Sequence, residues 1–223
     1  MVSSLPVKPE LGPTLTQLLR PWWRRSSLPV RVAAAVAAGL VVVVLALGVL
    51  GGATSDETTV VVREPLAFNL RHGPTLERIE PGRGELLALD QRRGALFLQS
   101  FRVASLRLEP YEGLPAGELP VVAEGLKERL ARRYGEFRLV EEGRITINEV
   151  PGYEVVFSAR SQDDRRLYGR WVMMVPEEPG ERDGVTLELL GTPAAGIPNA
   201  EAIGDEGQLK LPLRSFRFGT EVL

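Results

Sequence analysis

One long apolar run dominates the first quarter of the chain. Residues 32–52 include no charged side chain over 21 positions. At 1.5 Å per residue, a helix of this length spans about 31 Å, which is close to the hydrocarbon thickness of a bilayer. The run therefore predicts a transmembrane helix over residues 29–52.

After this run, short segments alternate apolar and polar residues with the period of two that is typical of β-strands. We predict a hairpin from residues 85–90 and 95–100, whose second arm continues to residue 111. Apolar residues change phase along that arm, which predicts bulges near residues 99–100 and 104–105. Residues 71–74 form a predicted turn with His72 in solvent. Further strands are predicted over residues 58–62, 65–70, 136–141, 144–149, 152–160, 165–175 and 184–190.

Residues 119–134 have the period of an amphipathic helix. Pro120 is tolerated in the first turn, and Gly135 is a typical residue after a helix C-terminus. The apolar side of this helix consists of Leu119, Val122, Ala123, Leu126, Leu130 and Tyr134. Antiparallel strands with one helix between them predict an α+β fold. We expect an antiparallel β-sheet covered by this one long helix and preceded by the single transmembrane helix.

This pattern divides the chain into four parts. Residues 1–28 form a cytoplasmic basic tail, residues 29–52 cross the membrane, residues 53–62 contain a tether and the entry to the first strand, and residues 63–221 form an extracytoplasmic α+β domain. Two alternatives remain open for the apolar run: a cleaved signal peptide, and a twin-arginine export signal. The small residues 51–53 offer a cleavage site in either case.

Charge supports this topology. Residues 1–31 carry five basic side chains and Glu10, so their net charge is +4, and because the whole chain is −2 the remainder carries −6. A basic flank before an apolar span is typical of a cytoplasmic N-terminus. Indole and guanidinium groups at the inner interface would anchor the span in the lipid bilayer, and they come from Trp22, Trp23, Arg24 and Arg25. Pairs of small residues in the span suggest a weak homodimer.

Composition excludes several classes of protein. The chain has no cysteine and one histidine, which excludes disulfides and thiolate sites and disfavours a histidine metal centre, so we predict no metal and no cofactor. A net negative domain disfavours nucleic acid as a partner. Basic residues are almost all arginine, with lysine only at positions 8, 127 and 210. That bias indicates a GC-rich, bacterial coding sequence.

The order of elements resembles the PsbP-like superfamily over about residues 63–218. The resemblance depends on a first strand pair that begins PLAFNL, the helix followed by the strands VPGYEVVFSAR and RLYGRWVMMVP, and the final Ser215-Phe216 pair. Pro212 departs from the pattern because it weakens the final helix that such domains have. Members of this superfamily are typically binding or assembly domains in envelopes and membranes without shared catalysis, which implies a binding role here.

No catalytic motif stands out, since the chain lacks a nucleophile elbow and a phosphate loop. We predict a non-enzymatic single-pass membrane protein of the cell envelope that binds a protein partner or an envelope polymer. The rival is an extracytoplasmic glycan-active hydrolase that uses paired carboxylates. A basic and aromatic cluster is the predicted partner surface, made by Arg165, Arg166, Tyr168, Arg170 and Trp171.

Overall fold

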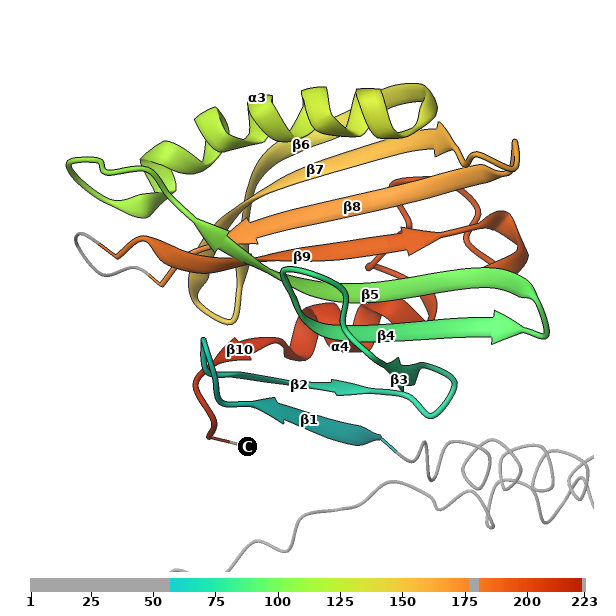
Figure 1. Ribbon diagram of the computed structural model, residues 1–223, viewed down its shortest axis with the longest axis horizontal. Coiled ribbons are helices and arrows are strands. Elements are labelled where there is room, and N and C mark those ends of the chain that lie inside the picture. Colours follow the sequence, from blue (N-terminus) through green and yellow to red (C-terminus); the bar gives the residue numbers. More distant parts are fainter. Residues whose placement is uncertain (1–56, 177–180, 222–223) are drawn as a thin grey trace, which may run out of the picture. The chain divides into compact units, whose positions relative to one another are not determined.

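The computed structural model describes residues 57–176 and 181–221, all within one compact unit, Ser55–Leu223. Ten strands in this part of the chain form two antiparallel sheets (Figure 1). The predicted span 29–52 and the anchor residues 22–25 lie outside the described residues. Among the helices that the structure describes, none is both long and apolar enough to cross a membrane.

The larger sheet has seven strands in the order β3-β4-β5-β9-β8-β7-β6. Strand β9 is inserted between β5 and β8, so the two halves of the sheet are joined by a strand from late in the sequence. The strands are β3 (Glu77–Ile79), β4 (Glu85–Arg93), β5 (Leu96–Arg107), β6 (Gly135–Ile147), β7 (Val150–Arg160), β8 (Arg166–Met174) and β9 (Asp183–Gly191).

One face of this sheet, which we call the Leu189 face, is covered by the smaller sheet. Strands β1 (Thr58–Val62), β2 (Phe68–His72) and β10 (Arg217–Phe218) pair in the order β1-β2-β10. Figure 1 shows them together with helix α4 (Lys210–Ser215) on the opposite side of the large sheet from α3. The 3-10 turns η1 (Pro193–Ala195) and η2 (Gly207–Leu209) lie in the preceding loop. The shared core includes Phe68, Leu70, Phe101, Leu189, Leu213 and Phe216.

The opposite face, which we call the Trp171 face, carries helix α3 (Pro115–Arg133) over β6, β7 and part of β8. Pro115 starts the helix, Arg132 and Arg133 suit its negative C-terminal end, and Tyr134 N–H donates to Leu130 O. After Pro115, its buried residues are Leu119, Ala123, Leu126 and Leu130, which share a core with Val155, Phe157, Trp171 and Met173. Burial of this stripe stabilises the helix more than propensity does.

The predicted fold class is wrong. We predicted one sheet covered by one long helix behind a transmembrane helix. The described chain is instead mainly β-sheet, with a second sheet over one face, and its longest helix contacts only the β6–β8 side of the other face. Sequence periodicity missed the second sheet because its third strand, β10, has only two residues and lies more than 140 residues after β2 in the chain.

The predicted irregularities of β5 occur in its ladder with β4. The register shifts there between Gln99 and Phe97 and between Ala104 and Val103 of β5, within about two residues of the predicted positions. The ladder of β5 with β9 is uninterrupted from Gln99 to Arg107. Apolar residues of β5 change phase because Phe101 and Val103 enter the core of the Leu189 face, whereas Leu106 packs into the core beneath α3.

His72 is buried at the end of β2, paired with Thr58, and is not a solvated turn residue. The final helix does form, but it is only six residues long and contains Pro212.

Gly169 provides a test of the packing beneath α3. A methyl group at this position would overlap three atoms of the Phe157 ring, which is fully buried. Overpacking of this kind costs about 1–3 kcal/mol, so we expect Gly169→Ala to lower the free energy of unfolding by that amount in urea titrations. Gly143→Ala is the control, because a methyl group there meets no atom within 4 Å. Equal stability of the two variants would contradict the packing.

Candidate functional site

The β7–β8 hairpin ends in the tight turn that the sequence predicts at residues 161–164. Ser161 N–H donates to Arg165 O, Asp164 N–H donates to Ser161 O, and Asp164 takes the positive φ that closes the turn. Arg160 Nη1 donates to Asp164 O over 3.0 Å. The strand ends on either side of this turn are therefore held firmly.

A cavity of about 520 Å³ lies beside these strand ends. We call it the hairpin pocket. Cross-strand pairing brings Arg138, Ser158 and Tyr168 into one row and Arg160 and Arg166 into the next. It is lined by Glu136, Phe137, Arg138, Ser158, Ala159, Arg160, Arg166 and Tyr168. A volume of this size is within the range of small-molecule sites.

The charges of the hairpin pocket are only partly balanced. Arg160 donates from Nε to Glu136 over 2.8 Å and from Nη1 to the Asp164 carboxylate over 3.2 Å. These contacts raise the pKa of Arg160, the hydrogen bond to Glu136 most of all. Arg138 and Arg166 have no ion-pair partner in the described part of the chain. The pocket therefore offers two guanidinium groups to a ligand.

Two smaller hollows lie near the same hairpin turn. One, of about 300 Å³, is lined by Arg133, Tyr134, Ser161, Gln162 and Asp163. The other, of about 210 Å³, is lined by Phe97, Ser161, Asp163, Arg165, Leu167, Leu190 and Thr192. Ser161 and Asp163 line both hollows, so the turn separates them from each other.

The structure separates the five residues of the predicted partner surface. Arg166 and Tyr168 line the hairpin pocket, and Arg165 lines the smallest hollow. Arg170 and Trp171 are buried on opposite faces of the sheet, because neighbouring residues of a strand point in opposite directions. Arg138 and Ser158 complete the pocket, and the sequence analysis missed them because they come from other strands.

Arg170 has a structural role on the Leu189 face. Its Nη2 donates to Asp205 over 2.7 Å and to Glu201 O over 3.1 Å, which fixes the loop before α4 against the sheet. Hydrogen bonds and charge from Arg170 and Arg214 hold the pKa of Asp205 below its usual value despite burial. Burial raises the pKa of Glu154, whose carboxylate lies 3.6 Å from Arg170 Nε.

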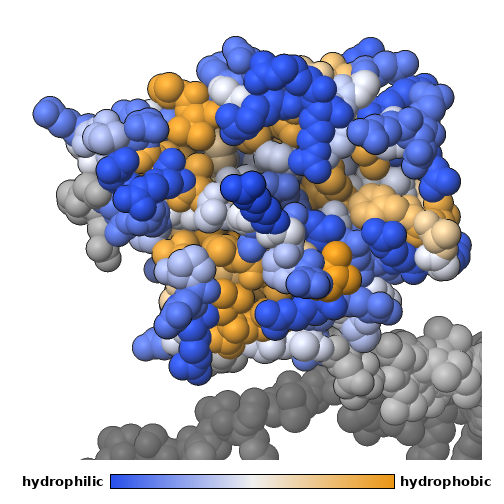
Figure 2. Space-filling model, viewed as in Figure 1, coloured by the Kyte–Doolittle hydropathy of each residue, from blue (hydrophilic) through white to orange (hydrophobic). Residues whose placement is uncertain are grey.

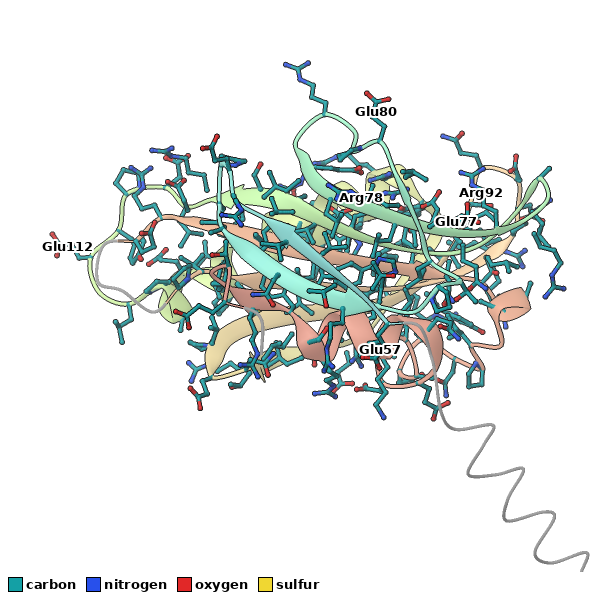
Figure 3. All side chains as sticks on the ribbon, turned by 90° about the horizontal axis from the view of Figure 1, so that it is seen from below. Glu57, Glu77, Arg78, Glu80, Arg92 and Glu112 are labelled. Atoms are coloured by element: carbon teal, nitrogen blue, oxygen red, sulfur yellow. The ribbon has the colours of Figure 1, made fainter. Side chains whose placement is uncertain are left out.

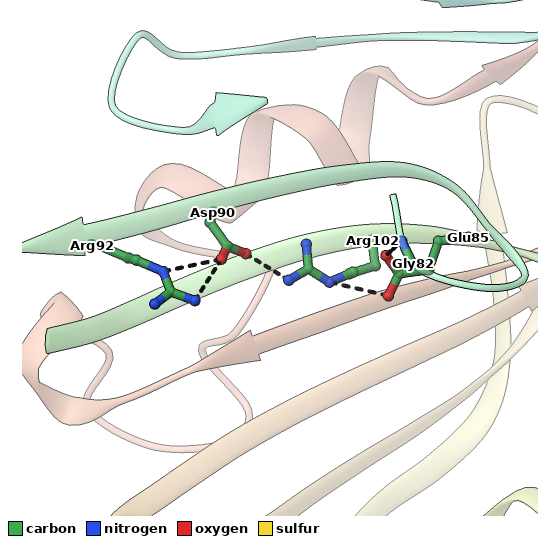
Figure 4. Close-up of polar contacts among 5 residues, drawn as sticks. All are labelled: Gly82, Glu85, Asp90, Arg92 and Arg102. Atoms are coloured by element: carbon green, nitrogen blue, oxygen red, sulfur yellow. Dashed lines mark hydrogen bonds and ion pairs between the residues drawn. The ribbon is translucent and has the colours of Figure 1, made fainter. Parts of the chain in front are cut away.

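On the Trp171 face, one cross-strand row contains Trp171 of β8, Glu188 of β9 and Arg102 of β5. Arg102 is turned away from Glu188, toward β4. It lies 3.3 Å from Glu85 and 2.8 Å from Asp90, and Asp90 also pairs with Arg92 (Figure 4). Burial raises the pKa of Glu188 to about 7, opposed by the charges of Arg133 and Arg102.

The surface around these sites is mixed. Figure 2 shows hydrophilic residues over most of the side it presents, with apolar residues in separate areas between them. Figure 3 shows Glu77 and Arg92 near one another at the β3–β4 edge, beside the buried Asp90 that pairs with Glu77 in the strand register. Within the described residues, no group of three or more His, Cys, Asp or Glu side chains is placed to hold a metal ion.

Glu188 generates a prediction about pH. The pKa of Glu188 is about 7 in the folded protein, against 4.5 for an ordinary glutamate. Between pH 4.5 and pH 7 the folded protein therefore keeps this carboxyl group protonated, whereas the unfolded chain loses the proton. The stability that comes from the protonated carboxyl is complete below pH 4.5 and is lost as pH rises through 7. We expect the free energy of unfolding to fall by about 1–3 kcal/mol across this interval, and Glu188→Gln to abolish that part of the decrease.

Glu112→Gln is the control, since Figure 3 places Glu112 at the exposed end of the loop before α3. Chemical denaturation at pH 5 and pH 8 measures both variants. The same pH dependence in Glu188→Gln and in the unmodified protein would contradict the assignment.

No protein-family model matches the sequence, and no curated protein matches it significantly. Solved structures do match. LpqN of Mycobacterium tuberculosis, described as involved in cell envelope biogenesis, aligns with a TM-score of 0.52 at 12% identity over 74% of this chain and 91% of that one. Cyanobacterial PsbP (CyanoP) from Synechocystis sp. PCC 6803 aligns with a TM-score of 0.50 at 10% identity over 75% and 95%.

The Ran-binding protein Mog1p of Saccharomyces cerevisiae aligns at 10% identity with a TM-score of 0.47, over 74% of this chain and 96% of that one. Identities this low establish the fold alone. The predicted resemblance is confirmed at that level: the domain after the apolar run has a PsbP-like fold.

Proposed function

We propose that this chain is a non-enzymatic binding protein of the bacterial cell envelope and that it holds an envelope component in the hairpin pocket. The observation that carries this proposal is the pair of guanidinium groups, Arg138 and Arg166, that line a cavity without ion-pair partners among the described residues. Unpaired guanidinium groups around a hollow are suited to binding and do not by themselves supply a nucleophile or a general base.

Two further observations support an envelope role. The fold is shared with LpqN, whose description places that protein in envelope biogenesis. The basic flank of residues 1–31 and the apolar run after it are typical of a chain whose C-terminal domain is exported. We propose a cytoplasmic N-terminus and an extracytoplasmic domain, held at the membrane or released by cleavage near residue 53.

The rival function, a glycan-active hydrolase, has one observation in its favour. Glu188 has a pKa near 7, as general acids often do. The carboxylate whose charge acts on Glu188 is Glu85, and it is poorly placed for catalysis because it lies 3.3 Å from Arg102 Nε and accepts a hydrogen bond from Gly82 N–H over 2.8 Å. Binding therefore remains the better supported function.

A pull-down from envelope fractions tests the binding proposal. We expect the full chain in detergent, and its Arg93→Ala control, to retain an envelope component that the Arg138→Ala, Arg166→Ala double variant loses. Arg93 is an exposed arginine at the β4–β5 turn, so the control removes a charge outside the hairpin pocket. The hydrolase would be favoured if neither the unmodified protein nor any variant retained a component and if the protein turned over envelope glycans in a way that depends on Glu188.

Protease protection tests the proposed location. Protease added to cells whose outer envelope has been permeabilised should digest the domain after residue 53. An N-terminal tag should stay protected until the cytoplasmic membrane is lysed. The topology predicts this because the positive flank stays in the cytoplasm. Digestion of the tag in unlysed cells, with the domain protected, would contradict the orientation.

A further inference from the structure

We infer that the hairpin pocket recognises an acidic sugar, that is, a sugar unit carrying a carboxylate or a phosphate. The inference rests on the proposed binding function and names the class of its ligand. It depends on three properties of the pocket: an arginine without a counter-charge opposite a paired one, a second free guanidinium group, and a mainly polar lining.

Arg160 and Arg166 are directly opposite one another across the β7–β8 ladder. Like charges in this position destabilise a sheet. Glu136 and Asp164 neutralise Arg160, but nothing in the described chain neutralises Arg166. Arg166 is therefore the member of this pair that lacks a counter-charge, which a bound anion would supply.

Arg138 lies on β6 and is paired with Ser158 of β7, which in turn is paired with Tyr168 of β8. These three side chains line the pocket together with Arg166. Guanidinium groups bind carboxylate and phosphate oxygens through paired N–H donors, and the serine hydroxyl adds a further donor or acceptor. The ligand is therefore expected to present one acidic group between the two arginines.

The remaining lining favours a sugar as the carrier of that group. Its polar side chains include Ser158 and the paired Glu136 and Arg160, which can exchange hydrogen bonds with hydroxyl groups. Phe137 and Ala159 belong to the core beneath α3, and Tyr168 is only 7% exposed and already donates from its hydroxyl to Pro198 O over 3.3 Å. A sugar presents several hydroxyl groups to such a lining, whereas a long acyl chain would find little apolar surface there.

Glu136 limits how much negative charge the pocket accepts. It lines the same cavity and its carboxylate is bound by Arg160. A ligand with one acidic group per sugar can avoid this carboxylate, whereas a densely charged polyanion meets repulsion from it. Glu136→Gln should therefore strengthen binding of an acidic sugar, while the arginine contacts are kept.

Calorimetric titration of the full chain in detergent, at one fixed ionic strength, tests the inference. The probes are tri-galacturonic acid, glucose 6-phosphate, neutral maltotriose, inorganic phosphate and phosphatidylglycerol vesicles. We expect an acidic sugar to bind, and Arg138→Ala and Arg166→Ala each to weaken it about tenfold. Arg93→Ala should leave the affinity unchanged, and maltotriose should not bind. If an arginine variant fails to fold, Glu136→Gln still tests the inference, because we expect this variant to bind the acidic sugar more tightly than the unmodified protein does.

Three results would overturn the inference. Equal affinity for inorganic phosphate and for both acidic sugars would show that no sugar is recognised. Arginine-dependent binding of vesicles without binding of the sugars would assign the pocket to lipid headgroups. Absence of binding to every probe, while the pull-down still recovers an arginine-dependent component, would remove the acidic sugar but leave the proposed binding function in place.

Discussion

Alternation of side chains along β8 is the constraint on which the rest of the structure depends. Eight of the nine residues of this strand are buried, and they are directed in turn to the two faces of the sheet. Arg170 therefore enters the Leu189 face, where it binds Asp205, while Trp171 enters the core beneath α3. Because both faces must be covered, the sheet needs the smaller sheet with α4 on one side and α3 on the other.

This arrangement leaves a cavity beside the end of the β7–β8 hairpin. The covering elements bury the middle of β8, so the polar residues near its start, together with the matching ends of β6 and β7, face a cavity. Arg160 has two carboxylate partners there, Glu136 and Asp164, whereas Arg138 and Arg166 have none among the described residues. We interpret these two guanidinium groups as the anion-binding part of the pocket.

Sequence periodicity predicted most of the large sheet and the position of α3, since each of these elements is long and strongly patterned. It missed the second sheet, because strands as short as β10, with two residues, have no detectable period. For the hairpin pocket, it singled out Arg166 and Tyr168 but grouped them with Arg170 and Trp171. These residues are neighbours in the sequence, but side chains alternate between the two faces of a strand, so they cannot all share one surface. Arg138 could not be found, since its place beside Ser158 depends on the β6–β7 register and its two shifts.

The most direct measurement of the central claim is an NMR titration of the arginine side-chain Nε–Hε signals of the full chain with tri-galacturonic acid. Our account predicts that the signals of Arg138 and Arg166 move together and saturate, while that of the buried Arg170 stays in place. Movement confined to arginines outside the hairpin pocket, such as Arg92 and Arg102, would contradict the account.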